Sequence, residues 1–210
     1  MDQHYFSHVR REIAPLLPDH MQRVLEVGCG EGATLAWLKQ QNRAQQVVGV
    51  EYSEAAAAVA RQHLDQVWQG DVEKLPLETL GQFDVVLCLD VLEHLVDPWQ
   101  TLQRLRGLLR PGGCIIVSVP NVQHYSVVLP LLLHGRWPYQ AAGILDRTHL
   151  RFFTRSSAEQ LLQSAGLTLS GTCHAGAEWA PSRFWRWLGK FRAAAPWTSV
   201  QYIMRGDLAL

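Results

Sequence analysis

Three features that would point to a membrane span, a nucleic-acid partner or a cysteine framework are missing from this sequence. The apolar run from Val127 to Leu133 is short and contains Pro130, so no segment approaches the length of a membrane-spanning helix. The 19 basic and 19 acidic residues leave a formal net charge of zero, which makes a nucleic-acid polymer an unexpected partner. The four cysteines are scattered, with neither metal-ligand nor disulfide spacing, and we expect reduced thiols.

The N-terminus also lacks the apolar core of a signal peptide, because charged residues interrupt its hydrophobic positions. We accordingly predict a cytoplasmic protein. A chain of 210 residues has the size of one domain with a substantial core. We predict a single domain over residues 1–210, in which residues 1–20 carry an N-terminal helix at 4–17.

The sequence does contain a glycine-rich turn between a strand and a helix. The stretch from Val24 to Thr34 starts as an apolar run, includes the acid Glu26, and continues with Gly28, Gly30 and Gly32 at alternate positions. A helical pattern follows at once, so the first N–H groups of that helix point at the turn. Glycines let the backbone bend sharply and let a ligand lie against bare main chain. The stretch therefore indicates a binding site for a nucleotide-like cofactor.

Strands and helices alternate over the first 120 residues, which is typical of a doubly wound parallel sheet. We expect strands at 23–28, 46–51, 67–70, 83–89 and 114–119, and helices at 33–41, 54–63 and 98–109. Ser53 would cap the second helix, and Pro111-Gly112-Gly113 would end the third. The acids Glu51, Asp71 and Asp90 follow three successive strands. Because ligands bind at the carboxyl ends of such strands, we expect these acids to line one crevice.

The alternation breaks over residues 122–151, which we interpret as a cap insertion above the strand ends. A helix at 156–165, capped by Ser156 and ended by Gly166, and strands at 168–173 and 199–205 complete the pattern. A second insertion spans 175–198. Within it, residues 182–192 mix aromatic and basic side chains, which indicates either a helix packed on the domain or a basic amphipathic helix on a membrane.

The run Glu26-Val27-Gly28-Cys29-Gly30-Glu31-Gly32 resembles the first motif of the class I S-adenosylmethionine-dependent methyltransferases, acid-x-Gly-x-Gly-x-Gly. The resemblance implies a Rossmann-like α/β fold whose seven-stranded sheet is mostly parallel, with an antiparallel last strand. It also implies that Glu51 binds the ribose of the cofactor, that Asp71 binds the adenine, and that the glycine turn approaches the amino-acid end. The expected cofactor-binding residues are Glu26, Gly28, Cys29, Gly30, Gly32, Glu51, Tyr52, Asp71, Val72, Leu89 and Asp90.

A second cluster, Asp90-Val91-Leu92-Glu93-His94, begins where the fourth strand ends. A histidine at this point would either take the proton from an acceptor hydroxyl or only stack beside the cofactor. Together with His149, the cluster resembles residues that bind Mg²⁺ in small-RNA 2′-O-methyltransferases and ubiquinone-biosynthesis O-methyltransferases. We take His94 and His149 as candidate catalytic residues. The candidate ligands of a divalent cation are Asp90, Glu93, His94 and His149, although two histidines are unusual for Mg²⁺.

The implied activity is methyl transfer from S-adenosylmethionine, leaving S-adenosylhomocysteine, to an oxygen of a small molecule, a sugar or a lipid-linked glycan. The run from Leu145 to Thr154 is similar to one in bacterial methyltransferases of glycan gene clusters. A quinone-precursor O-methyltransferase and a non-catalytic, cofactor-binding regulatory partner are alternatives. An NAD-dependent oxidoreductase also fits Gly28-x-Gly30-x-x-Ala33, but Glu26 would repel a pyrophosphate and no residue set for hydride transfer is found.

Overall fold

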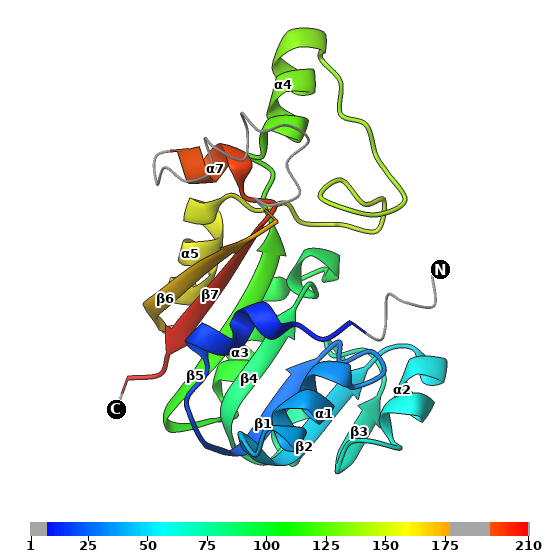
Figure 1. The fold of residues 1–210 in the computed structure, drawn as a ribbon, viewed down its shortest axis with the longest axis vertical. Helices are drawn as coiled ribbons and strands as arrows, with labels where there is room; N and C mark the ends of the chain where they lie inside the picture. Colours follow the sequence, from blue (N-terminus) through cyan, green and yellow to red (C-terminus); the bar gives the residue numbers. More distant parts are fainter. Residues whose placement is uncertain (1–7, 177–193, 210) are drawn as a thin grey trace.

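A seven-stranded sheet forms the centre of the protein. The computed structural model describes residues 8–176 and 194–209, and there the strand order is β3-β2-β1-β4-β5-β7-β6 (Figure 1). Strands β1 to β5 run parallel to one another, whereas β7 runs antiparallel to both β5 and β6. The predicted fold class is confirmed. The strands are β1 (Met21–Val27), β2 (Ala44–Glu51), β3 (Gln66–Gln69), β4 (Phe83–Leu89), β5 (Leu109–Pro120), β6 (Thr168–Ala175) and β7 (Gln201–Asp207).

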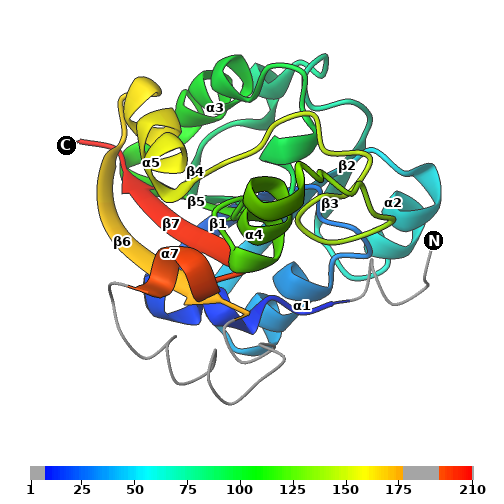
Figure 2. The same cartoon turned by 90° about the horizontal axis from the view of Figure 1, so that it is seen from above.

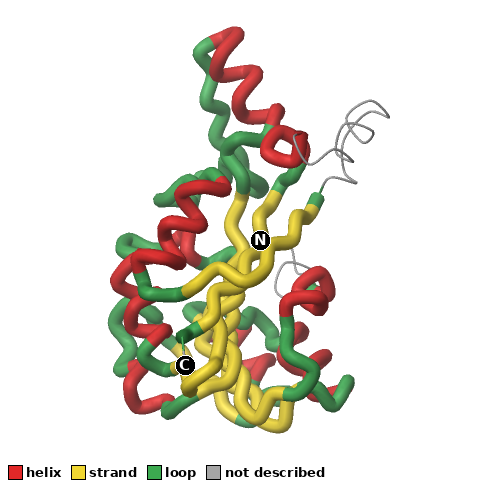
Figure 3. Tube along the Cα trace, turned by 90° about the vertical axis from the view of Figure 1, so that its left-hand side faces the viewer, coloured by secondary structure: helices red, strands yellow, loops and turns green. Residues whose placement is uncertain are grey.

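Helices cover both faces of this sheet (Figure 3). The α-helices are α1 (Ala33–Gln40), α2 (Glu54–Ala60), α3 (Pro98–Arg106), α4 (Tyr125–His134), α5 (Arg155–Ser164) and α7 (Ala195–Thr198). Short 3₁₀ helices are η1 (Arg11–Leu16), η2 (Leu77–Leu80) and η3 (Leu92–His94). Among the described residues, no helix has the length and apolar character needed to cross a bilayer.

The alternation of side chains along each strand divides the core in two. In β4, Val85 packs into the layer that contains η1 and α1, while the next residue, Val86, packs into the layer that contains α3 and α5. Both valines are fully buried, as expected for central parallel strands covered on both faces. The carboxyl ends of these strands are therefore the free edge at which a site can form.

Two sequence expectations about element ends were wrong. Helix α3 ends at Arg106, and the Pro111-Gly112-Gly113 run lies inside β5, where the pairing with β4 shifts register between Phe83 and Val85. A Cβ on Gly113 would lie 3.0 Å from the carbonyl oxygens of Arg110 and Asp84, so the bulge needs glycine there. Helix α5 is capped by Thr154, which forms a capping box with Ser157, and not by Ser156.

The N-terminal helix is also shorter than expected. Residues 1–7 lie outside the described part of the chain, and the remainder forms only the six-residue η1, which contains Pro15. Proline has no N–H to donate, which limits the helix to this short form. Ile13 and Leu16 are buried against the sheet. The aromatic and basic run at 182–192 lies outside the described residues as well.

The insertion after β5 projects beyond the carboxyl ends of the strands. Figure 1 shows α4 rising away from the sheet, and the view from above places it over the strand ends (Figure 2). A small cluster of its own, Val127, Ile144 and Leu145 with Trp137 and Phe152 packed against them, holds the insertion together. The insertion thus lies above the edge of the sheet at which the parallel strands end.

Candidate functional site

A cavity of about 630 Å³ opens at the carboxyl ends of β1, β2 and β4. This volume lies in the range of small-molecule sites. Ten of the eleven expected cofactor-binding residues line the cavity; Gly32 does not. Gly32 instead has a φ of +82° at the N-cap of α1, where its missing side chain leaves room for Leu64. The ten residues that do line the cavity thus form one contiguous surface.

The glycine turn brings bare backbone to the floor of the cavity. Gly28 has a φ of +67°, and a Cβ at this position would lie 2.4 Å from a methyl carbon of Val91. Its N–H and that of Cys29 donate to the carbonyl of Val50 in the neighbouring strand β2, at 2.8 and 3.2 Å. Both the backbone angle and the close neighbour require glycine.

We predict that Gly28→Ala destabilises the protein by about 2–4 kcal/mol, since it adds steric overlap to the cost of a left-handed backbone. Gly135→Ala is the matched control, because Gly135 has a φ of +61° with nothing within 4 Å of its Cβ position. The control should lose only the backbone contribution of about 1–2 kcal/mol. Urea unfolding measures both values, and equal losses would show that the Val91 contact has no effect.

Two acidic side chains lie at the ends of β1 and β2. The Glu51 carboxylate accepts hydrogen bonds from the N–H groups of Gly30 and Ser53, both at 2.8 Å, and these fix its orientation. Glu26 is only 4% exposed, and its Oε2 has no hydrogen-bond partner. Burial raises the pKa of Glu26 to about 8, and the nearby Glu51 adds to this shift while Arg10 opposes it. Glu26 therefore carries a proton at neutral pH until a cation approaches it.

The remaining strand-end acids differ in their surroundings. Asp71 accepts from the N–H of Glu73 at 3.0 Å and pairs with the exposed Lys74, and the hydrogen bond from Lys74 lowers the pKa of Asp71. Asp90 has a φ of +57°, and its Oδ1 accepts from the Ser118 hydroxyl at 2.6 Å and from the Gln201 amide at 2.9 Å. Asp90 is thus held by β5 and β7, at the rim of the cavity.

Arg10 completes the cavity and was not predicted from the sequence. It forms ion pairs with Asp90 and Glu12, and its guanidinium donates to Gln201 Oε1 at 3.2 Å. Its backbone N–H donates to the Thr34 hydroxyl at 3.2 Å. A lone arginine 80 positions from its partner carries no local motif, so only the fold reveals this contact. His8, Arg10 and Thr34 all line the cavity.

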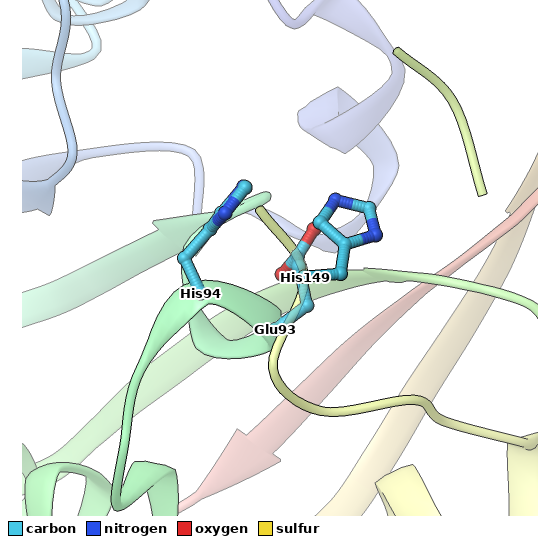
Figure 4. Close-up of side chains that lie close together, drawn as sticks. All are labelled: Glu93, His94 and His149. Carbon is cyan, nitrogen blue, oxygen red and sulfur yellow. The ribbon is translucent and has the colours of Figure 1, made fainter. Parts of the chain in front are cut away.

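Glu93, His94 and His149 meet beside the cavity (Figure 4). One ligand atom from each of these side chains lies within 4.8 Å of the other two. The rings of His94, which lines the cavity, and His149 are 4.7 Å apart between centroids. Asp90 is not in this group, and its oxygens instead accept hydrogen bonds from Arg10, Ser118 and Gln201. Of the four predicted cation ligands, three therefore come together.

The backbone explains how His149 reaches His94 and Glu93, which lie 55 and 56 positions earlier in the chain. The Glu93 carbonyl accepts the N–H groups of Leu150 and Arg151, at 2.8 and 3.0 Å, and so holds the end of the insertion on η3. His149 Nδ1 lies 3.1 Å from the Ile144 carbonyl. A proton on Nδ1 would satisfy that carbonyl, and Nε2 would then carry the free lone pair. The insertion thus supplies an imidazole whose orientation is fixed by the Ile144 carbonyl.

Glu93 is the group of the cluster whose buried polar atoms have no hydrogen-bond partner. Its side chain is 1% exposed, and neither carboxylate oxygen has a hydrogen-bond partner. Burial raises the pKa of Glu93 well above its ordinary value. A buried carboxyl without a partner is unfavourable for folding unless something else binds it. Such a group beside two imidazoles can hold either a shared proton or a divalent cation.

Sequence comparison finds a family profile described as "Methyltransferase domain", which matches residues 1–170. The ubiquinone biosynthesis O-methyltransferase of Acinetobacter baumannii is 32% identical over 157 residues, covering 70% of this chain and 64% of that protein. The protein of the same name from Pseudomonas aeruginosa is 37% identical over 108 residues, covering 48% and 45%. The chain thus matches less than two thirds of the length of these relatives.

Solved structures share the fold at lower sequence identity. A Haloferax volcanii methyltransferase, determined in complex with the Trm112 methyltransferase activator, superposes with a TM-score of 0.66 at 17% identity, covering all of this chain and 92% of that one. A methyltransferase from Thermotoga maritima has a TM-score of 0.63 at 20% identity, with coverages of 94% and 86%. These similarities concern the fold alone.

Proposed function

Because the chain belongs to the methyltransferase domain family, we propose that it transfers a methyl group from S-adenosylmethionine to a hydroxyl oxygen of a small acceptor. The observation that carries this proposal is the juxtaposition of the cavity with the Glu93, His94 and His149 cluster. The cavity would supply the cofactor site, and the cluster would supply groups that can act on a hydroxyl. A regulatory protein without catalysis would have no need for the second.

The cavity residues fit the chemical groups of this cofactor. The unpartnered Oε2 of Glu26 offers a buried acceptor to a cation, and the compound carries both a sulfonium and an ammonium group. Gly28 and Gly30 leave the adjacent floor free of side chains, while Glu51 offers its remaining lone pairs to the ribose hydroxyls. Arg10 supplies a cation for a carboxylate. When bound, the cofactor supplies an activated methyl group.

The chain's own task is then to position the acceptor and accept its proton. Holding two reacting atoms in line contributes about 7–11 kcal/mol at best. The His149 imidazole, oriented by the Ile144 carbonyl, would accept the proton at Nε2, with His94 between it and the cavity. Alternatively, Glu93, His94 and His149 would hold a divalent cation that lowers the pKa of the acceptor hydroxyl. Two imidazoles favour a transition metal over Mg²⁺.

The acceptor proposed first is a sugar or lipid-linked glycan hydroxyl, and the second is the phenolic hydroxyl of a quinone precursor. The names of the relatives support the second. Exposed Tyr139 and half-buried Trp137 in the insertion can stack on either ring type. Incubating the protein with labelled S-adenosylmethionine and either a catechol or a diol sugar distinguishes the two. Label in neither acceptor, nor in a metabolite extract, would contradict O-methyl transfer.

For the cofactor, we predict that Glu51→Ala weakens S-adenosylhomocysteine binding by more than about tenfold, or 1.4 kcal/mol. Titration calorimetry measures this affinity, and Glu54→Ala is the control because Glu54 is exposed and absent from the cavity lining. Unchanged affinity would remove Glu51 from the site. Binding of NAD in place of S-adenosylhomocysteine would contradict the proposed cofactor.

A cytoplasmic location belongs to the same proposal. All four cysteines are unpaired, which supports a reducing compartment.

A further inference from the structure

Helix α4 exposes an apolar surface that neither the cofactor site nor the core uses. Leu129 and Leu131 are about two-fifths exposed, while Leu132 and Leu133 near the tip are 73% and 69% exposed. Val127 is the one residue of the helix that is buried. The helix itself points away from the sheet (Figures 1 and 3).

The distribution of the leucines favours a surrounding apolar medium over a single flat partner. At 3.6 residues per turn, the four exposed leucines are spread over about 200° of the helix circumference. A helix that packs on a protein shows an apolar stripe of about 100°, whereas a helix that is apolar nearly all round is buried within a core or a membrane. The spread of about 200° at the tip of α4 is wider than such a stripe, so a single flat partner would leave part of it exposed to water.

The charges around α4 indicate which surface it meets. From Pro98 to Leu145 the sequence contains no aspartate or glutamate. His134 is the last residue of the helix and Arg136 lies just after it, and both are exposed. Tyr139 and Trp197 are exposed aromatic residues. Trp197 lies in α7, next to the base of the insertion, because the Asn121 side chain donates a hydrogen bond to the Pro196 carbonyl at 2.8 Å. Leucines at a tip, with aromatic rings nearby and cations in an acid-free stretch of sequence, match an anionic lipid surface.

We propose that α4 docks on an anionic phospholipid bilayer, with its exposed leucines among the acyl chains and Arg136 at the headgroups. The ten-residue helix is about 15 Å long, which allows the 5–10 Å penetration of an interfacial segment without crossing the bilayer. The docked insertion also holds His149, because Trp137 packs edge-to-face on Phe152 and Phe152 contacts His149. The docking itself does not depend on methyl transfer.

The test is co-sedimentation of the full chain with two kinds of vesicle, phosphatidylcholine alone and an equal mixture with phosphatidylglycerol. The wild-type protein should bind the mixed vesicles more tightly. Leu132→Gln combined with Leu133→Gln should weaken binding about a hundredfold, or about 2.8 kcal/mol at 1.4 kcal/mol per tenfold. S-adenosylhomocysteine binding by the double variant should be unchanged, which shows that it folds.

The charge contribution is tested by Arg136→Gln, which should weaken binding to the mixed vesicles about fivefold, with no effect on the weak binding to phosphatidylcholine. Arg61→Gln is the matched control, because Arg61 is also exposed but lies at the end of α2, far from α4 (Figure 1). The proposal is overturned if the wild-type chain binds neither vesicle, or if the double leucine variant binds as well as the wild type. Self-association that the leucine change abolishes, without vesicle binding, would instead assign α4 to contact between copies.

Discussion

Replacing Glu26 with glutamine is expected to stabilise the protein and to weaken its binding of the methyl donor. The Glu26 carboxyl is buried, and burial raises its pKa to about 8. In the unfolded chain the same group ionises at its ordinary pKa of 4.5. Between these two pH values the folded protein retains a proton that the unfolded chain has released.

The sign of the stability effect follows from this difference. Because the folded state binds more protons, the free energy of unfolding decreases as pH rises from about 4.5 to about 8. At pH 7 the loss is about 3 kcal/mol, at 1.36 kcal/mol per pH unit. Glutamine has the same shape and does not titrate, so Glu26→Gln should recover this free energy at pH 8 and little of it at pH 5. Urea unfolding at both pH values checks this, and equal gains would contradict it.

The affinity effect has the opposite sign. A cationic ligand favours the ionised form of Glu26, so the proton must leave when the donor binds. Wild-type affinity should therefore rise by up to about tenfold per pH unit from 6 to 8. The ligand's own amino group titrates in the same range, but it does so with both proteins, so the wild-type slope minus the Glu26→Gln slope isolates Glu26. Calorimetry in buffers of different ionisation enthalpy measures the released proton directly.

His149→Ala is expected to have the largest effect on turnover, a loss of about 10²–10⁴ in kcat, with binding of S-adenosylhomocysteine unchanged. His149 contacts His94 and is absent from the cavity lining, so its removal should spare the cofactor site. His63→Ala is the control, because His63 is an exposed histidine outside the cavity lining. Equal activity of the two variants would exclude His149 from the reaction.

A second measurement separates a cation site from a proton relay. If Glu93, His94 and His149 hold a cation, the wild-type protein should bind one Mn²⁺ per chain in equilibrium dialysis, and exhaustive chelation should abolish methyl transfer. Glu93→Gln should abolish Mn²⁺ binding while retaining the cofactor affinity. Full activity after chelation, together with no Mn²⁺ binding, would leave proton transfer by His149 as the role of the cluster.

The sequence predicted the sheet and much of the lining of the cavity because both depend on local patterns. Alternating apolar strands and helices specify a doubly wound sheet, and the carboxyl ends of its parallel strands meet at one edge. Glu51, Asp71 and Asp90 could therefore be placed together without coordinates. Element ends were less predictable, since Pro111-Gly112-Gly113 suits both a helix stop and a bulge, and only pairing with β4 selects the bulge.

The cluster beside the cavity shows where sequence patterns reach their limit. Glu93 and His94 could be assigned to the end of the fourth strand, and His149 could be named as a candidate partner. That Glu93 is buried without a partner depends on the insertion, whose backbone closes over η3 through Leu150 and Arg151. The occupation of Asp90 by Arg10, Ser118 and Gln201 depends on contacts between four separate segments. Neither the burial of Glu93 nor the bonding of Asp90 can be predicted from the sequence next to these residues.

By itself, the sequence determined that this chain forms a parallel α/β sheet with a glycine turn and acidic strand ends, because backbone geometry and side-chain periodicity act over a few residues. Tertiary structure alone determined that Glu26 is kept neutral, that Arg10 closes the cavity, and that α4 stands exposed above it. The burial, charge state and exposure of a residue depend on which distant segments pack against it. Those contacts form only in the folded chain.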